Sequence, residues 1–121
     1  DTVVALSRRI LSKAESDEDV HACLKMLSGR AHQVITAVAL LTPDGALRRR
    51  TVLTRVTFCR FDTAGMETYV QSREGIGKAG GYAIQGRAET FVRRLNGSWS
   101  NVVGLPLAET VALLRGNSYL S

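Results

Sequence analysis

The chain has 121 residues, of which 45% are hydrophobic and 22% charged, and its 16 lysines and arginines exceed its 11 aspartates and glutamates to give a formal net charge of +5. This length is suited to one domain with its own hydrophobic core, and the composition excludes global disorder. No run approaches the ~18 consecutive apolar residues of a membrane span. The positive charge favours an anionic partner, such as a nucleic acid, a nucleotide or a phospholipid.

The first elements predicted are a buried strand and a helix. Residues 2–6 are aliphatic or β-branched, which predicts a short strand that is apolar on both faces. Ser16 is a typical helix N-cap, and three carboxylates follow it where they favour the helix dipole. Apolar residues at 20, 23, 24 and 27 share one helical face, and Gly29 occupies the position of a helix-ending glycine.

The middle of the chain predicts a long antiparallel hairpin. Residues 32–41 are rich in valine, alanine, leucine, isoleucine and threonine, which predicts its first strand. The sequence Thr-Pro-Asp-Gly at 42–45 is a turn signal. Residues 47–61 alternate in character and predict the second strand.

A second helix and a glycine-rich loop are expected next. Asp62 is positioned to cap a helix whose apolar stripe contains Met66, Tyr69 and Val70. Four glycines then fall within residues 74–81, which predicts a loop.

The last third predicts two further strands and a helix. Residues 88–95 and 99–103 are expected to pair around Asn96-Gly97 as a type I′ hairpin. Pro106 is suited to the first position of a final helix over residues 107–114. The chain is therefore expected to be a mixed α/β (α+β) domain with about five strands, three helices and two hairpins.

The two cysteines predict neither a metal site nor a disulfide framework. Cys23 and Cys59 lie far apart, without a CxxC spacing, and each falls in an apolar pattern. We expect two buried free thiols, which favours a reducing, cytoplasmic setting.

A few polar residues are candidates for chemistry. Asp1 stands at the end of the first strand, where it is a candidate general base or divalent-metal ligand; a plain solvated carboxylate is the alternative. Lys78 lies in the glycine-rich loop, whose backbone can approach an anion closely, and Lys13 is a second candidate phosphate contact; either could equally be an ordinary surface lysine. Gln85 could read the edge of a base or make a structural bond to the backbone.

Two arginine runs raise the alternative of a basic nucleic-acid-binding module. They occupy residues 48–50 and 93–94. Because successive strand residues point to opposite faces, neither run forms one contiguous surface, and solvated strand faces are the favoured interpretation. The chain has only seven aromatic residues, a composition that disfavours a stacking surface for nucleic acid.

Several segments together resemble the Maf-like nucleotide pyrophosphatases. In chain order they are DTVV at 1–4, LSG at 27–29, TRVTF at 54–58, KAGGYAIQG at 78–86 and NVVGLPL at 101–107. The last two are long enough to be specific, and the similarity spans nearly all of the chain. The resemblance implies a Maf/ITPase-like fold, which is an elongated mixed sheet with long antiparallel hairpins, flanked by helices and holding a central cleft.

The resemblance also implies an activity. It is hydrolysis of a nucleoside triphosphate to the monophosphate and pyrophosphate with a divalent cation, Mg²⁺ or Mn²⁺. The DT and KAGxYxIQG forms look like the branch that acts on dTTP and UTP, with the sister branch that acts on 7-methyl-GTP as the alternative. Residues 1–121 are then expected to form a single Maf-like domain that lacks the family's N-terminal segment, and the family analogy favours a homodimer.

By the same resemblance, five residues are assigned roles. Asp1 corresponds to the proton acceptor, Lys13 and Lys78 to phosphate contacts, and Thr2 and Gln85 to positions that influence the choice of base. These roles agree with what attack on an α-phosphorus requires, namely a deprotonated water and neutralised phosphate charge. Since a lone carboxylate is a weak base at neutral pH, a cation that acidifies the water would assist it.

Overall fold

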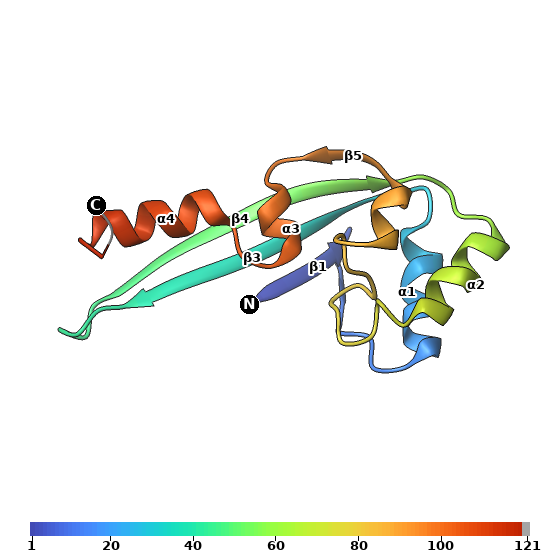
Figure 1. Ribbon diagram of the computed structural model, residues 1–121, viewed down its shortest axis with the longest axis horizontal. Coiled ribbons are helices and arrows are strands. Elements are labelled where there is room, and N and C mark those ends of the chain that lie inside the picture. The colour runs from blue at the N-terminus through green and yellow to red at the C-terminus, as the bar shows by residue number, and fades with distance from the viewer. Residues whose placement is uncertain (120–121) are drawn as a thin grey trace.

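The structure is a computed structural model that describes residues 1–119, and it is built on one elongated five-stranded sheet (Figure 1). The strands are β1 (Thr2–Leu6), β2 (Arg9–Leu11), β3 (Ala31–Leu41), β4 (Leu47–Phe58) and β5 (Val92–Asn96). Their order in the sheet is β2-β1-β3-β4-β5, and every neighbouring pair is antiparallel. The predicted α/β class is confirmed.

The predicted long hairpin is β3–β4, and it is the longest feature of the molecule. Its ladder runs without a break from Ala31 opposite Thr57 to Leu41 opposite Leu47. β4 ends at Phe58, short of the predicted end at residue 61, because the backbone of Cys59 turns to bond with Phe91 and Gly29 instead. A much shorter hairpin joins β1 to β2.

The capping residues read from the sequence begin the first two helices. α1 (Asp17–Leu27) starts at Ser16, whose side chain accepts a hydrogen bond from the backbone N–H of Asp19. α2 (Thr63–Ser72) starts at Asp62, whose carboxylate accepts from the N–H of Gly65 at 2.7 Å. These bonds satisfy donors that the first turn of a helix leaves free. α4 (Leu107–Gly116) follows Pro106.

The predicted hairpin around Asn96-Gly97 is wrong. Residues 87–91 form a 3-10 helix, η1 (Arg87–Phe91), and only Val92–Asn96 is a strand. Residues 99–103 form a short helix, α3 (Trp99–Val103), so that the described chain has four α-helices rather than three. The Ser98 side chain caps α3 by accepting from the N–H of Asn101, and the buried Asn101 amide then bonds to the sheet. That tertiary anchorage outweighs the β propensity of the valines.

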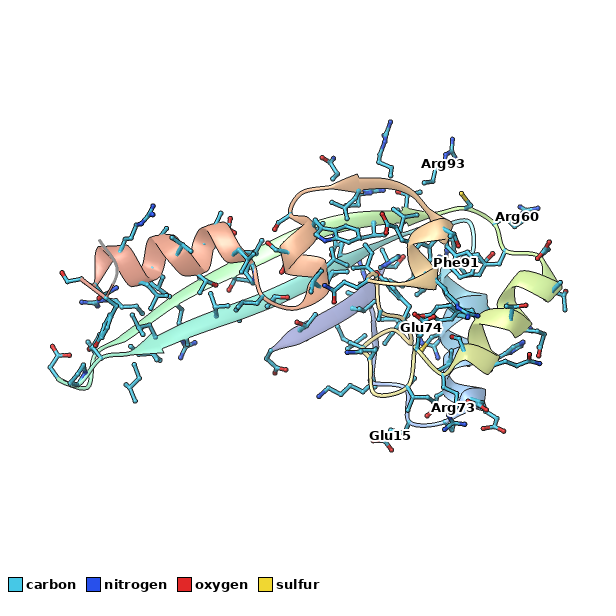
Figure 2. The ribbon with its side chains drawn as sticks, viewed as in Figure 1. Glu15, Arg60, Arg73, Glu74, Phe91 and Arg93 are labelled. Carbon is cyan, nitrogen blue, oxygen red and sulfur yellow. The ribbon has the colours of Figure 1, made fainter. Side chains whose placement is uncertain are left out.

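The hydrophobic core lies at one end of the sheet, under α1 and α2 (Figure 1). At its centre the Phe58 ring lies 4.8 Å from the ring centroids of both His32 and Tyr82. Phe91, from the end of η1, joins the same aromatic cluster, whereas Arg60 and Arg93 point into solvent (Figure 2). α4 lies along the hairpin away from this core, and α3 lies between the two, with its Val102 packed against the core.

The cysteine prediction is half correct. Both thiols are free, and Cys23 is buried on α1, but Cys59 is exposed. Cys59 follows Phe58 at the end of β4, and the alternation that buries Val56 and Phe58 places the next residue on the exposed side. Among residues 1–119 no helix has both the length and the apolar character needed to cross a bilayer.

Candidate active site

One pocket gathers all five residues that the sequence singles out. It has a volume of about 320 Å³ and lies where β1, the loop after β2, the glycine-rich loop and the end of α3 meet. Its lining includes Asp1, Thr2, Lys13, Lys78 and Gln85. Residues up to 84 positions apart in the chain are thus brought to a single cavity, of a size that suits a small molecule.

The β1–β3 ladder places Asp1 and Thr2 at the pocket. The Asp1 backbone nitrogen donates to the Ala37 carbonyl oxygen at 3.1 Å, and the Asp1 carbonyl accepts from Ala37 N–H at 3.0 Å. Thr2 lies directly opposite Thr36, and the two hydroxyl oxygens are 3.0 Å apart. Asp1 is exposed, so its carboxylate is accessible to water.

Backbone bonds bring the two lysines to the same cavity. Lys13 forms an isolated antiparallel bridge with Ala79. The N–H of Ala14 donates to the Lys78 carbonyl at 3.0 Å, and the N–H of Gly77 donates to the Ala14 carbonyl at 2.7 Å. The segment after β2 and the glycine-rich loop therefore behave as one layer that presents two positive side chains to the pocket.

A glycine is required where this loop meets β1. Gly80 has a φ of +72°, and a Cβ there would lie 2.9 Å from a methyl carbon of Val4. Any larger residue would push the loop away from the strand that carries Asp1. The glycines predicted to form a loop are thus also what allows it to close over the site.

The segment that carries Gln85 is held from the core by side-chain contacts. The Tyr82 hydroxyl lies 2.6 Å from His32 Nε2, and the N–H of Ala83 donates to the Tyr69 hydroxyl at 3.1 Å. Just after Gln85, Glu74 accepts from the N–H of Arg87 at 3.4 Å and approaches Arg87 Nε to 3.5 Å. Gln85 itself is exposed and lines the pocket, so a fixed backbone presents a free amide.

Burial sets the charge state of the groups behind this segment. His32 is almost fully buried, and burial lowers its pKa to about 4, so the imidazole is neutral at neutral pH. Burial also raises the pKa of Tyr82, with a smaller contribution from Tyr69. The wall of the pocket is therefore uncharged behind Tyr82, and the charges that face the cavity are those of Asp1 and the two lysines.

The pocket offers few side chains that could coordinate a divalent cation. Within residues 1–119, no three histidine, cysteine, aspartate or glutamate side chains lie close enough to hold a metal ion. Asp1 is the only carboxylate lining the pocket in that range. One carboxylate is enough for Mg²⁺ or Mn²⁺ when the substrate's own phosphate oxygens complete the coordination. The residues present fit a cation that arrives with a triphosphate.

Several residues at the site were not singled out from the sequence. Tyr82 and the end of α3, residues 102–104, line the pocket, and all of them fall within the two long motifs at 78–86 and 101–107. The sequence signal that could have found these residues was therefore their place inside the two motifs. The arginine runs lie elsewhere: residues 48–50 and 93–94 are exposed on the strands and do not line the pocket.

Comparison with known proteins gives consistent matches. Residues 1–117 match the family described as Maf-like protein. A relative from Mesorhizobium japonicum named dTTP/UTP pyrophosphatase is 56% identical over 119 residues, which cover 98% of this chain and 57% of the relative. A relative of the same name from Rhodospirillum rubrum is 58% identical with the same coverage. In Paramagnetospirillum magneticum the identity is 55%, over 96% of this chain and 61% of the relative. The chain thus spans about 57% to 61% of these relatives' lengths.

Proposed function

This chain belongs to the Maf-like protein family, and from that premise we propose that the protein carrying it hydrolyses dTTP and UTP to the monophosphate and pyrophosphate. The observation that carries the proposal is the single pocket that unites Asp1, Lys13, Lys78, Thr2 and Gln85. The relatives named dTTP/UTP pyrophosphatase support this choice of substrate over 7-methyl-GTP.

In the proposed reaction, Asp1 takes a proton from a water molecule. The water oxygen forms a bond to the α-phosphorus, and the bond from that phosphorus to the bridging oxygen breaks. Pyrophosphate leaves with the electron pair of the broken bond. The carboxylate is exposed to water and stands beside the cavity, which is the position such a base needs.

Lys13 and Lys78 bind the phosphates and stabilise the charge that grows on the leaving pyrophosphate. Backbone bonds join the two segments that carry them, so the backbone positions of both lysines are set before substrate arrives. From these fixed backbone positions, two flexible cationic side chains can reach the phosphates of one substrate.

We propose Mg²⁺ or Mn²⁺ as the cofactor, held by Asp1 together with substrate phosphate oxygens. When bound, such a cation acidifies water and neutralises phosphate charge. The presence of Asp1 as the one acidic lining residue of the described chain agrees with a cation shared between protein and substrate.

Thr2 and Gln85 are proposed to contact the pyrimidine edge. Both are polar, uncharged and at the pocket surface, and a hydroxyl and an amide can both donate and accept. A site built on such bonds rejects a base that leaves them unpaired. The free thiols of Cys23 and Cys59 further support a reducing, cytoplasmic setting.

The experiment is pyrophosphate release by the protein as its gene encodes it. We expect release from dTTP and UTP with Mg²⁺ or Mn²⁺, little from 7-methyl-GTP, and a fall in kcat of at least about 100-fold in Asp1→Asn. Asp44→Asn, at the far turn of the β3–β4 hairpin, is the matched control and should retain full activity. Absence of release, or an active Asp1→Asn protein, would overturn the proposal.

A further inference from the structure

A chain of buried hydrogen bonds runs from the pocket into the sheet. Thr2 and Thr36 are cross-strand neighbours whose hydroxyl oxygens lie 3.0 Å apart. Thr36 is fully buried, and its hydroxyl also donates to the backbone carbonyl of Asn101 in α3 at 3.2 Å. Thr2 alone of these three residues lines the pocket.

The direction of these bonds follows from counting protons. A carbonyl oxygen can only accept, so the bond to Asn101 uses the single hydroxyl proton of Thr36. The bond between the two threonines must then be donated by Thr2. With its own proton directed into the sheet, the Thr2 oxygen has only lone pairs left to offer to the pocket.

The backbone carbonyl of Asn101 depends on the Thr36 hydroxyl for its hydrogen bond. In α3 the N–H groups of Gly104 and Leu105 both donate to the Ser100 carbonyl, so Leu105 does not donate to Asn101 as it would in a continued helix. Asn101 is fully buried, and a buried carbonyl without a donor is costly. The reverse orientation, in which Thr36 donates to Thr2, would leave that carbonyl without the Thr36 bond.

The position of Asn101 is itself fixed by the sheet. Its side-chain amide nitrogen carries two protons and lies within hydrogen-bond distance of three acceptors, which are the carbonyls of Val34 at 3.0 Å and Val52 at 3.1 Å and the hydroxyl of Thr54 at 2.9 Å, so that one proton is shared between two of them. These bonds join β3, β4 and α3, so the acceptor that orients Thr36 cannot easily move away. The fold therefore sets the direction of donation along this chain of hydrogen bonds, from Thr2 to Thr36 and from Thr36 to Asn101.

We infer that Thr36 is a positioning residue that makes Thr2 a hydrogen-bond acceptor and so selects a pyrimidine whose N3 carries a hydrogen. Uracil and thymine have an N3–H donor, whereas the N3 of cytosine is an acceptor and meets the Thr2 lone pairs unfavourably. This inference rests on the proposed function, because it explains how the same pocket would favour UTP and dTTP over CTP.

Gln85 cannot supply this selectivity by itself. An amide can turn over to present either its oxygen or its nitrogen, and the exposed Gln85 side chain is free to do so. It can therefore match the 4-oxo group of uracil or the 4-amino group of cytosine. Only a group whose polarity is fixed by the fold can discriminate at N3, and Thr2 is that group.

The test is the ratio of kcat/KM for UTP to that for CTP. We expect Thr36→Val, which is nearly isosteric, to lower this ratio about tenfold, because the Thr2 proton is then free to turn toward cytosine. Thr36→Ser keeps the hydroxyl and should keep the ratio. Thr110→Val is the matched control: the part-buried Thr110 hydroxyl also donates to a backbone carbonyl, that of Pro106 at 2.7 Å, but it has no hydrogen bond to Thr2, Thr36 or Asn101. It should lower stability without changing the ratio.

The outcomes separate this inference from the proposed function. If the wild-type protein prefers UTP and Thr36→Val leaves the ratio unchanged, or Thr110→Val lowers it equally, the inference is overturned and the hydrolase stands. If the wild-type protein hydrolyses no triphosphate, the proposed function fails. The ratio of dissociation constants for UTP and CTP, measured by calorimetry with EDTA present, then decides the inference in the same variants. Failure of the wild-type protein to bind UTP more tightly than CTP would overturn it.

Discussion

The two ends of the β3–β4 hairpin have the same backbone pairing but different surroundings. At the base, Val34, Val56 and Phe58 are at most 1% exposed. At the tip, Leu41 is 69% and Leu47 47% exposed, and the arginines of residues 48–50 face solvent. Yet one uninterrupted antiparallel ladder joins both ends.

This contrast shows that pairing and burial are separate contributions in this molecule. The ladder satisfies backbone groups along its whole length, but α1, α2 and the glycine-rich loop cover the sheet at the base, and of the described helices only α4 lies along the hairpin toward the tip. The pocket lies on the covered side of that boundary, with β1 and the loop around it. Stability and activity should therefore depend on residues at the core end of the hairpin and be largely insensitive to changes at its tip.

The largest expected effect is that of removing the Phe58 ring, which lies at the centre of the core end of the β3–β4 hairpin. Phe58→Ala should lower the free energy of unfolding by about 3–5 kcal/mol, because the ring contacts His32, Tyr82, Phe61 and Phe91 in a packed cluster. The same truncation at the tip, Leu47→Ala, should change it by less than about 0.5 kcal/mol. Urea unfolding measures both. Equal losses would show that the hairpin is stabilised uniformly and would contradict the difference between its two ends.

The next effect is a pH dependence of stability that originates at the core end of the β3–β4 hairpin. In the unfolded chain the His32 imidazole takes a proton near pH 6.5, and in the folded protein only near pH 4. The unfolded state therefore binds more protons between these values, and stability falls as the pH drops through this window. Between pH 7 and pH 5 the loss from this group should be about 2 kcal/mol.

His32→Gln should remove that part of the pH dependence, whereas the same change at the half-exposed His21 should leave it in place. Urea unfolding of the three proteins at pH 7 and pH 5 gives the comparison. If His32→Gln keeps the full slope, burial of His32 is not its source.

A smaller effect is expected where the core holds the pocket wall. Tyr69→Phe removes the hydroxyl that accepts from Ala83 N–H, two residues before Gln85. We expect stability to fall by about 1 kcal/mol and the KM for UTP to rise about fivefold, with kcat nearly unchanged. Tyr119→Phe, on an exposed side chain near the end of α4, serves as the control. An unaltered KM would mean that Tyr69 stabilises the core without positioning the Gln85 segment.

The smallest effects are expected at the tip. Changing the three arginines of residues 48–50 to glutamine should shift stability by less than about 0.5 kcal/mol and leave pyrophosphate release intact. It also tests the nucleic-acid alternative, which requires binding that weakens steeply with salt. We expect a low-salt titration of the wild-type protein with DNA or RNA to show no such binding. Tight binding that the triple variant loses would make the tip a nucleic-acid surface.

Much of the fold could be predicted because its signals are local. Ser16 and Asp62 cap helices through bonds to residues three positions away, and the turn at 42–45 needs no distant partner. The signals failed where a distant contact decides the outcome. Residues 99–103 have the composition of a strand, but the Asn101 side chain anchors them as a helix over the sheet.

The sequence by itself determined the chemistry that this protein can offer. Asp1, Thr2, Lys78 and Gln85 lie within the motifs and Lys13 lies between two of them, and the resemblance to Maf-like proteins implied a triphosphate substrate before any contact was known. Only the tertiary structure decided that these residues share one pocket, and that the proton of Thr2 turns inward through Thr36. The physical reason is that a residue's functional groups are set by its identity, whereas the direction of a hydrogen bond depends on which partners the fold places beside it.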